Sequence, residues 1–171
     1  HENKILFGAD DGVFYALEME TGQTLWTFET DRQIRSSPLV SDGVVYFGSD
    51  DRRLYALDVE SGDPIWSFDA DSSIRSSAVI VRGTIFFGAD NGVLHALDAL
   101  TGLVKWEKPL SEDRGTVGIR FSPAVVEDKL LVATTRLGTG SSKFRGGFIP
   151  LSEATPRVIE SLRDAIKPIY E

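Results

Sequence analysis

The sequence predicts an all-β protein, a β-propeller built from four-stranded blades. Blocks of about forty residues align without gaps, one tryptophan returns in each block, and each block reads as short strands joined by turns. The positions that return at a spacing of 40 include Trp26, Trp66 and Trp106, and Gly22, Gly62 and Gly102. A fixed period of this size indicates repeated supersecondary units that pack on their neighbours.

The strands of one block follow from its residue pattern. In the second block VVYFGS, LYALDV and PIWSFDA are strand-like, DDRR and ESGD are turns, and SPLVSD supplies a fourth short strand. Asp11-Gly12 and Asn91-Gly92 are hairpin signals, because both residue types tolerate the positive φ of a tight turn. Four strands per repeat with no helical period match a propeller blade, whereas the coils of a β-solenoid are usually shorter.

Composition narrows the function classes. The 171 residues carry a net charge of −8, whereas a nucleic-acid-binding domain normally shows a basic patch, so no nucleic-acid partner is expected. Cysteine is absent, which excludes thiol catalysis, cysteine-ligated zinc and disulfides. No apolar run reaches the length of a membrane span, so the chain is not expected to span a membrane.

Three segments carry a family resemblance. ALEMETGQTLW (16–26), ALDVESGDPIW (56–66) and ALDALTGLVKW (96–106) resemble the tryptophan-docking motif of pyrroloquinoline-quinone-type propeller repeats. The resemblance covers about residues 5–128 and extends to the propeller lipoprotein of the outer-membrane β-barrel assembly machinery. It implies that each motif tryptophan packs between neighbouring blades and that the Thr-Gly pair turns the chain between the two outer strands.

The resemblance implies a non-enzymatic scaffold that presents a face to protein partners, binds no cofactor and works in the periplasm or at the cell surface. One rival is a fragment of a quinone-dependent dehydrogenase, a family that needs a calcium site, a tryptophan floor under the quinone and often a vicinal disulfide. Another rival is a sensor domain of a larger signalling protein. A shared fold does not decide among these functions.

The repeat also predicts the domain organisation. Residues 1–129 form three repeats, and residues 130–171 form a degenerate fourth blade with a long loop at 136–147 and a short helix near 156–166. In the alignment of the last block, Glu160 takes the place of the motif tryptophan. Three to four blades make a partial ring, and open edges invite pairing. A missing part of a longer chain, a second copy or the tail could complete the ring.

Arginines recur in IRSSP, IRSSA and IRFSP as Arg35, Arg75 and Arg120. The repeat puts them at one channel rim beside the acidic turns at 10–11, 50–51 and 90–91. They either pair with these turns and fasten one blade to the next, or form a cationic ring for an anionic ligand or acidic peptide. The basic residues of the long loop are further candidate partner contacts: Arg136, Lys143 and Arg145.

The remaining candidates for metal sites are interpreted structurally. The acidic turns do not converge as the oxygen ligands of calcium do, so they are read as hairpin turns whose aspartates accept backbone hydrogen bonds. His95 occupies the position of Tyr15 and Tyr55 and is expected to be a partly buried ring in a strand. No catalytic, cofactor-binding or metal-binding residue is predicted.

Overall fold

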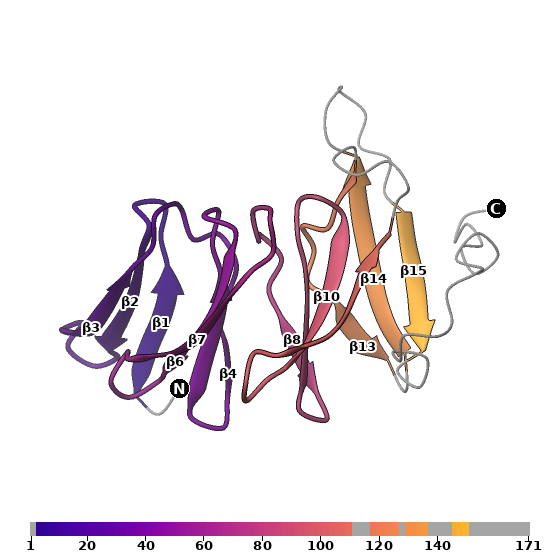
Figure 1. The fold of residues 1–171 in the computed structure, drawn as a ribbon. Helices are drawn as coiled ribbons and strands as arrows, with labels where there is room; N and C mark the ends of the chain where they lie inside the picture. The colour runs from indigo at the N-terminus through magenta and orange to yellow at the C-terminus, as the bar shows by residue number, and fades with distance from the viewer. Residues whose placement is uncertain (1–2, 111–116, 127–128, 137–144, 151–171) are drawn as a thin grey trace.

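The structure is a computed structural model that describes residues 3–110, 117–126, 129–136 and 145–150. These residues form strands and turns and no helix (Figure 1). The strands are β1 (Lys4–Gly8), β2 (Val13–Glu18), β3 (Thr24–Glu29), β4 (Leu39–Ser41), β5 (Val44–Gly48), β6 (Arg53–Asp58), β7 (Pro64–Asp69), β8 (Val79–Val81), β9 (Thr84–Gly88), β10 (Val93–Asp98), β11 (Val104–Pro109), β12 (Val117–Gly118), β13 (Ala124–Val126), β14 (Lys129–Arg136) and β15 (Arg145–Pro150).

The strands form antiparallel sheets that follow one another along the chain (Figure 1). The orders are β1-β2-β3, then β4-β5-β6-β7, then β8-β9-β10-β11. In the last sheet β13 and β15 flank β14, and β12 pairs with the end of β14. Each short strand after an IRSS segment is thus the first strand of the following sheet. This arrangement confirms the predicted all-β propeller with a partial ring.

Alternation along the strands builds the core between sheets. In β5, Val45 and Phe47 are buried and lie on one face of the pleat, as residues two apart must. Phe47 stacks on Phe14 of the preceding sheet with ring centroids 4.2 Å apart. Phe87, the equivalent of Phe47 one repeat later, is likewise buried. Stacked sheets with aromatic layers between them hold the turns at each end of the blades in a fixed row.

The last sheet overlaps the segment expected to be a long loop. β14 extends to Arg136 and β15 begins at Arg145, so both ends of the expected loop 136–147 belong to strands. Lys143 and the expected helix at 156–166 lie outside the described residues. Nothing in the described ranges forms a helix with the length and apolarity needed to cross a bilayer.

Candidate functional site

The three recurrent arginines lie against the acidic turns. Arg75 donates from Nε to Asp50 Oδ1 at 2.7 Å and from Nη2 to Asp50 Oδ2 at 2.9 Å. Its Nη1 lies 3.3 Å from Asp90 Oδ2 in the turn of the next blade. One guanidinium therefore joins two successive blades. The hydrogen bonds that Arg75 donates to Asp50 raise the pKa of Arg75 above its ordinary value, despite partial desolvation.

The other two arginines extend this pattern to both sides. Arg35 lies 3.1 Å from Asp10 and 3.7 Å from Asp50, and Arg120 donates to both carboxylate oxygens of Asp90 at 3.0 Å. The result is an alternating row that we call the rim ladder: Asp10, Arg35, Asp50, Arg75, Asp90 and Arg120. Its charges alternate in sign, so the arginines form no free cationic ring in the described residues. These contacts agree with the interpretation in which the arginines fasten one blade to the next. Binding of an anionic ligand by the arginines stays a prediction.

The residues flanking each arginine also join blades. Ile74 is buried against Gly48 of β5, where the Cβ of any larger residue would overlap its side chain. Ser76 Oγ donates to the carbonyl of Gly88 at 2.9 Å and accepts from the amide of Gly88 at 2.9 Å. Ile74 thus contacts the second blade and Ser76 the third. In IRFSP, Phe121 replaces this serine, so the hydroxyl contact is absent from that copy.

Two of the motif tryptophans, Trp26 and Trp66, contact the following blade. Trp66 Nε1 donates to the carbonyl of Ala99 at 3.1 Å, and a Cβ on Gly102 would lie 2.7 Å from the Trp66 ring. Trp26 makes the same contacts one repeat earlier, with Val59 O at 3.2 Å and Gly62. Trp106 lies near Phe86 of its own sheet, with ring centroids 5.8 Å apart. Among the described residues, nothing beyond its chain neighbours lies within 4 Å of a Cβ added at Gly22.

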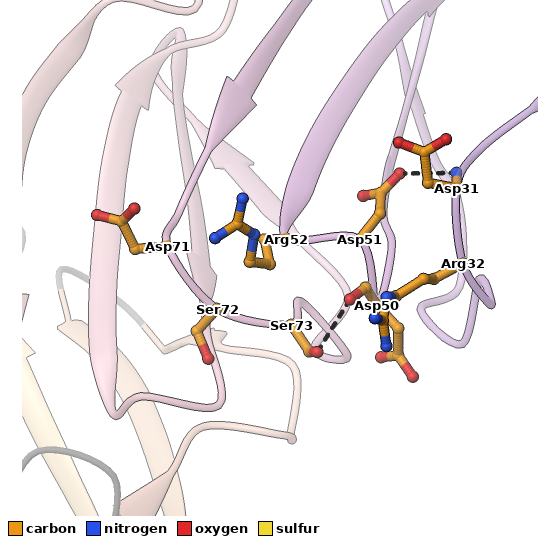
Figure 2. Close-up of a pocket in the computed structure, with 8 residues that line it drawn as sticks. All are labelled: Asp31, Arg32, Asp50, Asp51, Arg52, Asp71, Ser72 and Ser73. Carbon is orange, nitrogen blue, oxygen red and sulfur yellow. Dashed lines mark hydrogen bonds between the residues drawn. The ribbon is translucent and has the colours of Figure 1, made fainter.

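Beside the rim ladder the structure forms a charged pocket that the sequence analysis did not predict (Figure 2). Its volume is about 570 Å³, and it is lined by Asp31, Arg32, Asp50, Asp51, Arg52, Asp71, Ser72 and Ser73. Ser73 Oγ donates to the Asp50 carbonyl at 3.1 Å, and Asp51 accepts from the Asp31 amide at 3.3 Å. The pocket is therefore assembled from the β5–β6 turn of the second blade and from the loops that connect the first blade to the second and the second blade to the third.

Two non-glycine residues of this pocket, Arg52 and Asp71, have positive φ, and Arg52 is the one that replaces a glycine of the neighbouring repeats. Its φ is +81°, in the left-handed region that favours glycine, and the equivalent residues of the neighbouring repeats are Gly12 and Gly92. The Arg52 side chain is exposed, with Nη2 3.5 Å from Asp69 Oδ2. The change from DDGV and DNGV to DDRR is the sequence signal that could have identified it.

Asp51 is tied to the wall of the pocket. It accepts hydrogen bonds from Tyr55 Oη at 2.7 Å and from the amide of Arg53 at 3.0 Å. Burial and the hydrogen bond to Asp51 raise the pKa of Tyr55, so its hydroxyl stays protonated and donating. The hairpin reading of the acidic turns agrees with these backbone contacts. Among the described residues no group of three or more His, Cys, Asp and Glu is placed to hold a metal ion.

His95 is more buried than expected, with 2% of its surface exposed. It stacks on Phe87 with centroids 4.9 Å apart, and Nδ1 lies 3.0 Å from Glu107 Oε1. Nε2 has no hydrogen-bond partner in the part of the chain that the structure describes. The prediction of a partly buried ring underestimated burial because a neighbouring sheet covers this position. Burial lowers the pKa of His95, and Glu107 opposes that effect.

Comparison with known families agrees with the geometry. The family model described as outer membrane protein assembly factor BamB matches residues 1–149. The chain belongs to this family. Among curated proteins, no sequence matches the chain significantly.

Solved structures resemble the chain in fold. BamB from Moraxella catarrhalis is 21% identical with a TM-score of 0.73, and the match covers 88% of this chain and 44% of that one. Quinohemoprotein alcohol dehydrogenase ADHIIG from Pseudomonas putida HK5 is 20% identical with a TM-score of 0.68, covering 78% of this chain and 27% of that one. The computationally designed Ika4 protein is 18% identical with a TM-score of 0.67, covering 87% of each chain. This chain thus spans less than half the length of the BamB structure.

Proposed function

We propose that this protein is a non-enzymatic propeller scaffold whose pocket-bearing rim binds protein partners outside the cytoplasm. Membership of the BamB family supports a role in assembly of outer-membrane proteins. The dehydrogenases of similar structure are 20% identical to this chain and share its fold. A shared fold does not imply that this chain carries out their reaction.

The observation that carries the proposal is the conformation of Arg52. A non-glycine residue at φ +81° is strained, and strained residues cluster at functional sites, where the surrounding structure holds them in place. The neighbouring repeats relieve this strain with Gly12 and Gly92. Keeping an arginine in the second blade puts an exposed cation over a pocket that also holds Asp31 and Asp71.

The rim ladder is a second observation that supports the proposal. Asp50 is both a rung of the ladder and a lining residue of the pocket, so the arginines that hold it also hold the pocket wall. A binding face needs side chains that are already fixed, because ordering them on binding would cost free energy. The mixed charges of the pocket suit a polar polypeptide segment rather than an apolar ligand.

Site-specific photo-crosslinking in the cell that makes the protein tests this proposal. A crosslinking amino acid at Ser72 should trap one defined protein, whereas the same group at Asp63, an exposed residue in a turn of the second blade at the opposite end from the pocket, should not. Arg52→Gly should lower the yield from Ser72 at least fivefold without lowering the melting temperature. The same product from both positions, or an unchanged yield in Arg52→Gly, would contradict the proposed site.

A further inference from the structure

The third blade has an unusual end on the side away from the rim ladder. Strands β9 and β10 are joined at the rim by the turn that contains Asp90, and their other ends meet where Thr84 pairs with Asp98. Two turns lie at that far end, one between β8 and β9 and one between β10 and β11. We call residues 82–83 and 99–105 together the third-blade tip.

Backbone and polar contacts hold the two turns of the tip together. The amide of Ala99 donates to the carbonyl of Gly83 at 3.0 Å. Asp98, the carboxylate next to the tip, accepts from the amide of Thr101 at 3.0 Å and lies 3.3 Å from Lys105 Nζ. These contacts fix the turns without using the leucine side chains of the tip.

Those leucines face solvent. Leu100 is 77% exposed and Leu103 is 69% exposed, the highest values for large apolar residues in the described ranges. Val104, next to them, is 49% exposed. The equivalents of the two leucines in the earlier repeats are polar: Glu20 and Glu60, and Gln23 and Asp63. Single exposed apolar residues are ordinary, but a group of them marks a contact surface.

The charges of the tip also differ from those of the second blade. Residues 42–43 and 59–65, the equivalents in the second blade, contain three acidic residues and no basic one. The third-blade tip contains no acidic residue and two basic ones, Arg82 and Lys105. Both basic residues are exposed. The same place in the fold is therefore acidic in one blade and basic and apolar in the next.

Arg82 is the cation available for an external contact. It has φ +49°, in the left-handed region, and its equivalent Asp42 has φ +51°. Aspartate tolerates this conformation better than arginine does, so the arginine is kept here despite backbone strain. No other described residue forms an ion pair or side-chain hydrogen bond with Arg82.

The shape and chemistry of the tip suit a membrane surface. Beyond chain neighbours, no described atom lies within 4 Å of a Cβ added at Gly83, so this turn protrudes. Exposed leucines beside cations are typical of segments that bind the membrane interface. Their apolar groups enter the boundary with the acyl chains, and their cations stay at the phosphates of anionic lipids. A groove in a protein also accepts leucines, but the unpaired Arg82 favours a surface rich in phosphate.

We propose that the third-blade tip docks on a bilayer that contains anionic lipid. Leu100 and Leu103 enter the boundary between headgroups and acyl chains, and Arg82 contacts lipid phosphates. The net charge of the chain is −8, so the rest of the surface is repelled and the tip points toward the lipid. Because the rim turns lie at the other ends of the strands, docking directs the pocket away from the bilayer.

Flotation of the 171-residue chain with vesicles tests the proposal. One set is phosphatidylcholine, and the other contains phosphatidylglycerol as a third of its lipid. We expect binding to the anionic set, and Leu100→Glu should weaken it about tenfold or more. Leu25→Glu makes the same exchange at a 48% exposed residue of the first blade and should change binding by less than about twofold. No binding of the unchanged chain, or equal losses in the two variants, would overturn the proposal.

Arg82→Asp tests the contact with phosphate. It restores the residue that the second blade carries in the same backbone conformation, so the melting temperature should not fall. Binding to the anionic vesicles should weaken about fivefold or more, while binding to phosphatidylcholine alone should stay unchanged. Equal effects on both vesicles would overturn the assignment to anionic lipid. A crosslinking amino acid at Leu100 that traps a protein in the cell, without vesicle binding in solution, would assign the tip to a polypeptide instead.

Discussion

Arg75 and Asp50, 25 residues apart in the chain, form a two-bond ion pair with donor–acceptor distances of 2.7 and 2.9 Å. The Asp50 side chain is only 6% exposed, and Arg35 approaches it from the other side at 3.7 Å. Paired bonds of this geometry are among the stronger charge-assisted contacts in proteins. Asp50 is therefore the rung at which the rim ladder is most sheltered from solvent.

Neutralising Asp50 should cost more stability than neutralising Asp10. Asp50→Asn leaves two arginines facing each other with weaker acceptors, and we expect a loss of about 1–3 kcal/mol in the free energy of unfolding. Asp10→Asn removes an exposed pair and should cost about 0–1 kcal/mol. Urea denaturation of both variants measures the difference. Equal losses would mean that the burial of Asp50 adds nothing.

Alanine at two turn glycines separates the indole contact from backbone strain. Gly22 and Gly102 have φ of +71° and +70°, so both substitutions carry the same strain of about 1 kcal/mol. At Gly102 the new methyl group also meets the Trp66 ring, where a Cβ would lie 2.7 Å from its atoms. Gly102→Ala should therefore lower the free energy of unfolding by a further amount of about 1–3 kcal/mol. A loss no larger than that of Gly22→Ala would show that the indole moves aside freely.

Removing the Ser76 hydroxyl should destabilise the joint between the second and third blades. Ser76→Ala leaves the buried amide and carbonyl of Gly88 without this partner, at a cost of about 1–3 kcal/mol. Ser67 is exposed and serves as the control, because Ser67→Ala should change stability by less than about 0.5 kcal/mol. Amide exchange at Gly88 measures the local effect, and unchanged protection in Ser76→Ala would contradict it.

Glycine at position 52 should stabilise the chain. Arg52→Gly removes left-handed strain of about 1–2 kcal/mol, and the greater freedom of glycine in the unfolded chain offsets about 0.5–1 kcal/mol of it. We expect a net gain of about 0.5–1 kcal/mol, read from the midpoint of urea unfolding. Arg53→Gly, in strand β6, is the contrasting change and should destabilise. A loss in Arg52→Gly would show that the ion pair with Asp69 outweighs the strain.

Stability should fall on acidification through His95. Its pKa in the folded state is lowered from 6.5, so the unfolded chain takes up this proton first as the pH falls. The contribution is complete above pH 6.5 and is lost as the pH falls through the folded-state pKa. His95→Phe keeps an aromatic ring against Phe87 and should show a smaller loss between about pH 7 and about pH 5. Identical pH profiles would exclude His95 as the source.

The rim contacts were foreseen only in part. The spacing of Arg35, Arg75 and Arg120 put them at one rim beside the acidic turns. The sequence left open whether they pair with these turns or bind an anionic ligand, because the number of residues between two positions does not give the distance between their side chains. The structure places Asp50 and Asp90 between successive arginines. The pocket was not predicted, because its lining comes from turns and loops of several repeats that meet only in the folded chain.

By itself the sequence determined the repeat, the strands and the docking motif. A period of 40 is visible in Trp26, Trp66 and the turn glycines because every blade faces the same packing problem. Only the tertiary structure decided which copies of the turn glycine lie under a tryptophan ring. Gly22 and Gly102 occupy the same position of the repeat, yet Gly102 lies under an indole, whereas no described residue places one over Gly22. The physical reason is that a blade's contacts depend on its neighbours, and among the described residues the first blade has a neighbour on one side.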